Sequence, residues 1–214
     1  DRLVPVTGIV VAPKEPSAAG RPVINWEHGT TGTARVSAPS LAPNPAQELV
    51  ERSASAPIDY GVPYLYDFLK RGFVVAATDY YGLGGPGVHQ YFVGATAARN
   101  GLDIARAARN LSDTGAGSEV ITVGWSQGGH AALFTGEEQP SYASDLNQRG
   151  IVAIAPGTTA GIKYVNIPHI YLTMRSYESA YYAPLTGLTS QGRVLVDKAG
   201  QSSVTGVFQE AAKM

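Results

Sequence analysis

Cysteine is absent from the 214-residue chain, which excludes disulfides and thiolate chemistry. Charged residues make up only 15% of it, and a net charge of −1 leaves no basic surface of the kind that binds nucleic acid. No apolar run approaches the roughly 20 residues of a membrane-spanning helix, and the first residues lack the apolar stretch of a signal peptide. With 44% hydrophobic residues, the chain is long enough for one domain with a well-buried core.

Strand-like and helical patterns alternate along the first three quarters of the chain. The pattern predicts strands at residues 7–13, 21–26, 73–79, 119–125 and 151–156, and helices at residues 63–72, 96–111 and 127–138. Such alternation is typical of an α/β fold with a mostly parallel sheet flanked by helices on both faces. Residues 33–57, rich in Pro, Ala and Ser, are expected to form a surface excursion with a possible helix at 46–52.

The alternation of strand and helix patterns stops after residue 156, and this change divides the chain into two parts. We expect residues 1–156 to form the N-terminal part of the core, and residues 157–214 to form a cap or lid segment. Residues 194–196 fit a short strand, and residues 188–199 fit a helix equally well. The last seven residues look like a helix that is cut short. The cap segment contains many aromatic residues, among them Tyr164, Tyr171, Tyr177, Tyr181 and Tyr182.

The central motif is Gly124-Trp125-Ser126-Gln127-Gly128, which follows a β-branched run and precedes a helical stretch. This is the G-x-S-x-G pattern of a nucleophile elbow in the strand–turn–helix context that it requires. The serine lies on a strained turn so that its hydroxyl stands clear of the sheet, and the flanking glycines avoid a backbone collision. The motif predicts Ser126 as a catalytic nucleophile.

A second motif, His28-Gly29-Thr30-Thr31-Gly32, follows the strand at 21–26. Attack by a serine on an acyl group creates an oxyanion that two backbone N–H groups must stabilise. One donor is expected from Gln127, the residue after the nucleophile, and the other from a loop after an earlier strand. We predict Thr30 as that second donor, with Thr31 as the next choice. His28 is expected to support this loop rather than to act as the base.

A glycine-rich stretch at residues 82–87 has the spacing of a dinucleotide-binding loop. It does not follow the first strand, the next helix begins too late, and no acidic residue follows at the expected distance in a strand. We therefore expect no nicotinamide or flavin to bind here, and the glycines are interpreted as letting a long loop wrap close to the active-site rim.

The partners of Ser126 are harder to find. After the serine come only His130, inside the predicted elbow helix, and His169, while Asp197 has no histidine after it. The usual order in this fold is serine, acid, histidine. We therefore expect the triad Asp and His to come from a C-terminal part that is not on this chain, along with the last strands of the sheet.

These motifs together resemble the secretory lipase family, the lipase-A-like branch of the α/β-hydrolases. The resemblance rests on the two motifs above, on the stretches at residues 78–84 and 86–91, and on residues 188–197. It implies an α/β-hydrolase fold with a mostly helical cap, a secreted enzyme that hydrolyses carboxylic esters or triacylglycerols, and no cofactor or metal. Family members often carry cysteines near the positions of Ser37 and Ser203, where this chain has serine.

The sequence thus predicts a serine carboxylesterase or lipase that acts on a small-molecule ester or lipid. A second polypeptide from the same precursor would supply Asp and His. Two alternatives stay open: a peptidase or amidase on the same scaffold, and a non-catalytic binding protein that kept the elbow but lost its base.

Overall fold

The computed structural model describes residues 3–15, 17, 20–49, 61–157, 168–170, 173 and 189–214. Its centre is a five-stranded sheet in the order β1-β3-β2-β4-β5, in which β1 alone runs antiparallel to its neighbour. The predicted mostly parallel sheet is confirmed. The strands are β1 (Gly8–Val11), β2 (Arg21–Glu27), β3 (Val74–Thr78), β4 (Ala116–Trp125) and β5 (Asn147–Ile154).

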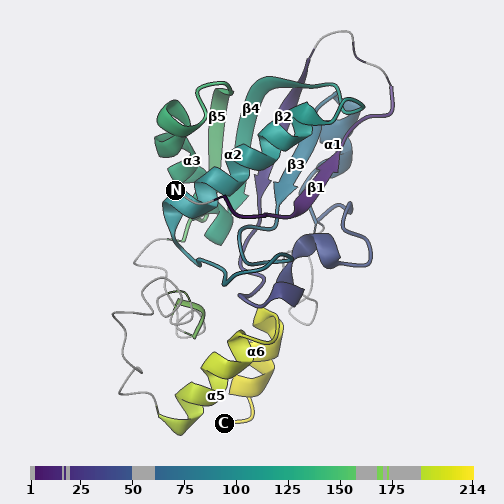
Figure 1. Cartoon of the computed structure of the whole chain (residues 1–214). Helices are drawn as coiled ribbons and strands as arrows, with labels where there is room; N and C mark the ends of the chain where they lie inside the picture. Colours follow the sequence, from purple (N-terminus) through teal and green to yellow (C-terminus); the bar gives the residue numbers. More distant parts are fainter. Residues whose placement is uncertain are drawn as a thin grey trace.

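The helices cover both faces of this sheet, as predicted. Alternate residues of a strand point to opposite faces, so each strand feeds two apolar cores. On one face Val23, Val74 and Val120 pack with Leu102 of α2 (Gly94–Asn110). On the other face the neighbouring strand residues pack with Leu65 of α1 (Leu65–Lys70). Helix α3 (Gln127–Tyr142) lies beside α2, which crosses in front of the sheet in Figure 1.

Helix α2 lies close to the sheet because its buried face is made of small residues. Ala98, Ala105 and Ala108 are fully buried, and Gly101 faces the polar end of β2. A Cβ built on Gly101 would lie 2.1 Å from Glu27 Oε1 and 2.9 Å from Asn25 Nδ2. The absence of a side chain at this position therefore sets the spacing between helix and sheet.

Beneath the carboxyl ends of the strands lie α5 (Ser190–Ala199) and α6 (Val204–Ala211), drawn in yellow in Figure 1. Of the two readings of residues 188–199, the helical one is therefore correct. The Ser203–Val204 turn between them binds the loop after β2: Val204 N donates to Thr31 O at 2.8 Å, and Gly32 forms a β-bridge with Ser203. The five cap tyrosines named above lie outside the described residues.

The expected surface excursion from residue 33 is corrected by the structure in its first part. Thr33, Ala34, Ser37 and Ala38 are buried beside two short 3-10 helices, η1 (Arg35–Ser37) and η2 (Pro39–Leu41). The Pro, Ala and Ser content of this segment suggests an exposed loop. Contacts with α5 bury its beginning instead, and one of them is the hydrogen bond that the Thr33 hydroxyl donates to Ala199 O. The helix suggested at 46–52 is also not found where the structure describes it, because Glu48 pairs with Val62 in a β-bridge.

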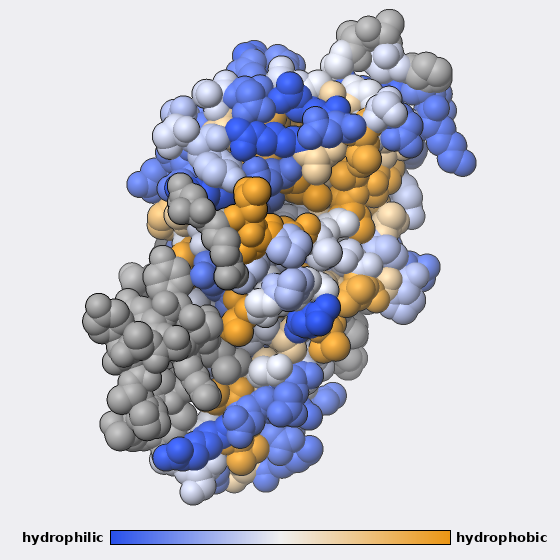
Figure 2. Space-filling view, viewed as in Figure 1, coloured by the Kyte–Doolittle hydropathy of each residue, from blue (hydrophilic) through white to orange (hydrophobic). Residues whose placement is uncertain are grey.

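Figure 2 shows polar side chains over α2 and apolar side chains over the edge strand β1 on this face of the molecule. The opposite edge strand, β5, is also apolar at its surface: Ile151, Val152 and Ile154 are 37%, 46% and 45% exposed. Among the helices in the described part of the chain, none is long and apolar enough to cross a membrane.

The spacing of α2 gives a direct stability test. Gly101→Ala would gain roughly 1 kcal/mol of helix propensity but would force α2 away from Asn25 and Glu27. We expect a net loss of roughly 1–3 kcal/mol in the free energy of unfolding, measured by urea denaturation. The matched control is Gly150→Ala, where an added Cβ meets nothing within 4 Å. Equal stability of the two variants would contradict the close packing.

Candidate active site

Ser126 lies at the turn between β4 and α3 with φ 56° and ψ −112°, a backbone conformation that L residues rarely adopt. Hydrogen bonds hold this strained residue in place. Ser126 N donates to Ile154 O at the end of β5, while Ser126 O accepts from Gly157 N at 2.8 Å and from His130 N at 3.1 Å. The side chain is partly exposed. The predicted strand–turn–helix context is therefore present.

The glycines of the motif are explained by collisions that a side chain would cause. A Cβ on Gly124 would lie 2.0 Å from Gly128 O, and one on Gly128 would lie 1.8 Å from Glu27 O and 2.7 Å from His28 O. The first turn of α3 thus packs directly on the backbone at the end of β2. This contact brings the His28–Gly32 loop beside the nucleophile elbow.

The two predicted oxyanion donors lie at this junction. Gln127 is the first residue of α3, so its N–H has no acceptor within the helix. Thr30 is partly exposed, whereas Thr31 is buried and its carbonyl is bonded to Val204. The difference in exposure favours Thr30 over Thr31 as the residue that meets a substrate.

His28 makes the contacts of a supporting residue. Its Nδ1–H donates to Gly29 O at 2.6 Å, Nε2 lies 3.4 Å from Asp79 O, and the ring packs on Tyr80 with centroids 4.6 Å apart. Burial lowers the pKa of His28, so the ring is neutral. These contacts hold the loop after β2 against the loop after β3.

Glu27 is fully buried between β2, α2 and α3. Its Oε1 accepts from the Thr135 hydroxyl at 2.9 Å and from Asn25 Nδ2 at 3.2 Å. No cation pairs with it among the described residues, and Oε2 has no partner there. Burial therefore raises the pKa of Glu27 to about 8, so the carboxyl is protonated at neutral pH.

A loop of residues 80–93 contacts both halves of the site. Gln127 Nε2 donates to His89 Nε2 at 2.8 Å, and the hydroxyls of Tyr91 and Thr30 are hydrogen bonded at 2.7 Å. Within this loop, a Cβ on Gly82 would lie 2.3 Å from His89 N. The absence of a side chain at Gly82 therefore lets the backbone of the loop pass close to His89.

All four histidines of the chain lie in the described part, and none bonds the Ser126 hydroxyl. His28 and His89 bind backbone carbonyls, while His169 is buried, with Nδ1 3.1 Å from the Thr33 hydroxyl. The ring of His130 lies between Phe92 and Phe134, at centroid distances of 5.1 and 4.7 Å. Burial lowers the pKa of His169 to about 4.

Asp197 lies on the exposed side of α5 rather than at the end of a strand. Among the described residues, neither His169 nor Asp197 forms a hydrogen bond with Ser126. In the part of the chain that the structure covers, the elbow is therefore present without a histidine hydrogen bonded to its serine hydroxyl.

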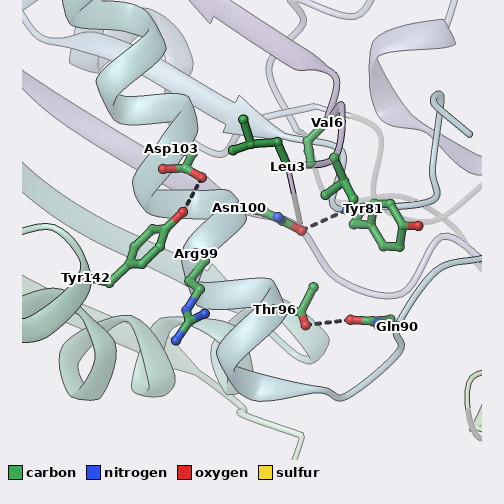
Figure 3. Close-up of a pocket in the computed structure, with 10 residues that line it drawn as sticks. Leu3, Val6, Tyr81, Gln90, Thr96, Arg99, Asn100, Asp103 and Tyr142 are labelled. Carbon is green, nitrogen blue, oxygen red and sulfur yellow. Dashed lines mark hydrogen bonds between the residues drawn. The ribbon is translucent and has the colours of Figure 1, made fainter. Parts of the chain in front are cut away.

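A cavity of about 750 Å³ lies between the N-terminal segment, α2 and the loop of residues 80–93. Its described lining does not include Ser126, Gln127 or Thr30. Figure 3 shows that several of its polar groups pair with one another: Tyr142 donates to Asp103, Tyr81 N to Asn100, and Thr96 to Gln90. We assign no role in the chemistry of Ser126 to this cavity.

The sequence model of the secretory lipase family matches residues 51–192, a span that contains the elbow. The chain belongs to this family. No curated protein has a sequence that matches the chain significantly.

Solved structures of an esterase and of a lipase share the fold of this secretory lipase chain. A ligand-bound form of the rice cell wall degrading esterase LipA from Xanthomonas oryzae superposes with a TM-score of 0.64 at 22% identity, over 97% of this chain and 57% of that one. Candida antarctica lipase A in its closed state gives a TM-score of 0.65 at 19% identity, over 94% of this chain and 48% of that one. The fold is therefore that of an α/β-hydrolase, and the chain spans about half the length of these relatives.

Three residues of the site were not singled out from the sequence alone. Glu27 could have been noticed as a carboxylate at the end of an otherwise apolar strand. His89 and Tyr91 lie in a loop without periodicity, where no pattern indicates which side chain turns inward. The Ser37 and Ser203 positions, by contrast, do come together, since both lie against Gly32.

Buried Glu27 predicts a specific pH dependence of stability. In the folded protein the carboxyl stays protonated up to a pH of about 8, whereas in the unfolded chain it ionises near 4.5. Unfolding therefore releases a proton between these values, and the free energy of unfolding falls as pH rises, by at most about 1.4 kcal/mol per pH unit. Glu27→Gln, which cannot ionise, should remove this slope in denaturant titrations at pH 5 and pH 8.

The comparison of variants isolates Glu27 from the buried histidines. The buried histidines make the free energy of unfolding fall as pH drops below about 6.5, because the unfolded chain binds protons there and the folded protein does not. This contribution is the same in the wild type and in Glu27→Gln, so it cancels in the comparison. Glu137→Gln on the exposed side of α3 should keep the wild-type slope. Parallel pH profiles for wild type and Glu27→Gln would show that the Glu27 carboxyl is ionised in the fold.

Proposed function

We propose that this secretory lipase chain carries the nucleophile and oxyanion hole of a carboxylic ester hydrolase. The observation that carries the proposal is Ser126, held in a strained conformation at the strand–helix turn by glycine contacts that exclude any Cβ. Strain of this kind is retained where it serves function, because it exposes the hydroxyl to a bound acyl group.

In the proposed reaction the Ser126 hydroxyl attacks the acyl carbon of the ester, and the proton passes to a histidine base. The N–H groups of Gln127 and Thr30 stabilise the negative charge on the former carbonyl oxygen. The alcohol leaves with that proton, and water then hydrolyses the acyl-enzyme to release the acid.

The base and its acidic partner are proposed to come from a part of the protein outside this chain, either a continuation of it or a second polypeptide of the same precursor. Two observations support this. The four histidines of the chain all have other contacts, and the edge strand β5 exposes three apolar residues that further structure could cover. The relatives of known structure are also about twice as long.

The proposed substrate is an uncharged ester or lipid, and the proposed location is outside the cell. Buried groups near the elbow are neutral at neutral pH, because burial lowers the pKa of His89 to about 3 and raises that of Glu27 to about 8. Residues 157–214, with α5 and α6 against the loop after β2, are proposed as the cap over the acyl site. Secretion agrees with the family's description.

The test is hydrolysis of p-nitrophenyl esters by the full-length protein that contains this chain. Ser126→Ala should lower kcat by about 10⁴-fold or more, because loss of a triad nucleophile removes covalent catalysis. The matched control is Ser141→Ala, an exposed serine on the same helix, which should keep wild-type activity.

The same assay separates the alternative functions. Amino-acyl anilides of matched acyl group should be cleaved far more slowly than the esters. Preference for anilides would indicate an amidase or peptidase. A folded full-length protein that cleaves neither, and whose Ser126 does not react with a fluorophosphonate, would indicate a binding protein and end the hydrolase proposal.

A further inference from the structure

The loop of residues 80–93 reaches both predicted oxyanion donors from one short segment. We propose that His89 and Tyr91 are positioning residues, which hold Gln127 and Thr30 at the correct separation for one oxygen atom. The proposal rests on the proposed function, because it concerns how the oxyanion hole of that reaction is kept in shape.

The contact between His89 and Gln127 has a fixed polarity. His89 Nδ1 lies 2.9 Å from Tyr81 O, a carbonyl that can only accept, so Nδ1 carries the proton. Nε2 is then a bare acceptor, and it receives the bond from Gln127 Nε2 at 2.8 Å. Gln127 is 2% exposed, so its side chain is locked inside the protein. The first residue of α3 is thus tied to the loop through its own side chain.

The contact between Tyr91 and Thr30 ties the other donor to the same segment. The two hydroxyls are 2.7 Å apart, and Tyr91 is 2% exposed while Thr30 is partly exposed. A buried phenol therefore fixes the side chain of a residue that faces the site. Because His89 and Tyr91 are two residues apart, the separation of the donors depends on a very short piece of backbone.

That piece of backbone is itself held rigidly. The Thr173 hydroxyl donates to His89 O at 2.9 Å and accepts from Tyr91 N at 2.8 Å. The His89 ring stacks on Tyr80 at 5.8 Å and packs on Tyr91 at 6.1 Å. Five loop residues have positive φ. In the two that are not glycine, this strained conformation persists only because surrounding contacts maintain it. The five residues are Tyr80, Gly82, Gly84, Gly87 and Phe92.

We call the hydrogen bonds of His89 to Gln127 and of Tyr91 to Thr30 the brace, and the chemistry of the oxyanion explains why it matters. An oxyanion hole works only when both N–H groups lie about 2.7–3.1 Å from the developing negative charge, and misplacement by about 1 Å costs up to 10²-fold in rate. The ground-state ester makes weaker demands on the donors than the tetrahedral intermediate does. Loosening the brace should therefore lower kcat and leave KM nearly unchanged.

The experiment uses four variants of the full-length protein that contains this chain. Tyr91→Phe removes only the phenol oxygen, and His89→Leu removes both ring nitrogens. His89→Gln supplies an amide oxygen that can accept from Gln127 Nε2, so it is the rescue variant. Val88→Ala, an exposed neighbour in the same loop, is the control.

We expect Tyr91→Phe and His89→Leu to lower kcat for p-nitrophenyl butyrate by about tenfold or more, with KM changed by less than about twofold. The inhibition constant of a trifluoromethyl ketone with the same alkyl chain, which forms an oxyanion on the serine, should rise by a similar factor. His89→Gln should recover most of the loss, and Val88→Ala should behave as wild type.

Hydrogen exchange of the amides at residues 28–31 and 126–128 tests the brace without relying on activity. Exchange should accelerate in Tyr91→Phe and His89→Leu. Unchanged kcat and unchanged exchange in both folded variants would overturn the proposal, as would equal losses in His89→Gln and His89→Leu. If the wild-type protein cleaves no ester but exchange is faster in Tyr91→Phe and His89→Leu, the result supports the brace and counts against the proposed function.

Discussion

The structure depends on one close approach, between the first turn of α3 and the end of β2. At this point Gly128 lies so near the carbonyl oxygens of Glu27 and His28 that no side chain can be present. The approach turns the backbone sharply after β4, which raises Ser126 out of the sheet. It also brings the loop after β2 beside the serine. A packing constraint between two backbone segments thus creates the geometry on which the proposed chemistry depends.

Several titratable groups buried in and around this junction are uncharged at neutral pH and form no ion pairs within the part of the chain that the structure describes. Glu27 keeps its proton, and the rings of His28, His89 and His169 carry only one proton each, because burial disfavours the charged form of every one of these groups. A neutral interior can pack tightly without the large desolvation cost of buried ions. It also leaves the developing oxyanion as the main charge that the proposed N–H donors would meet.

Much of this arrangement can be predicted from sequence, and the rest cannot, for physical reasons. Buried strands such as β3 are visible because nearly every residue is apolar, and the elbow is visible because its glycines are demanded by local sterics. The burial of Thr33 and Ser37 depends on α5, which is far away in the chain. The contacts of His89 and Tyr91 come from an irregular loop, where side-chain direction follows no period. Tertiary contacts of this kind leave no local signal.

The central claim is that Ser126 is an activated nucleophile in the complete protein. The most direct measurement is peptide mass spectrometry after reaction of the full-length protein with a fluorophosphonate, followed by digestion. The account predicts one phosphonylated peptide, with the adduct on Ser126, and its loss when the protein is unfolded before the reagent is added. An unlabelled Ser126 in the folded, full-length protein, or an adduct on a different serine, would contradict it.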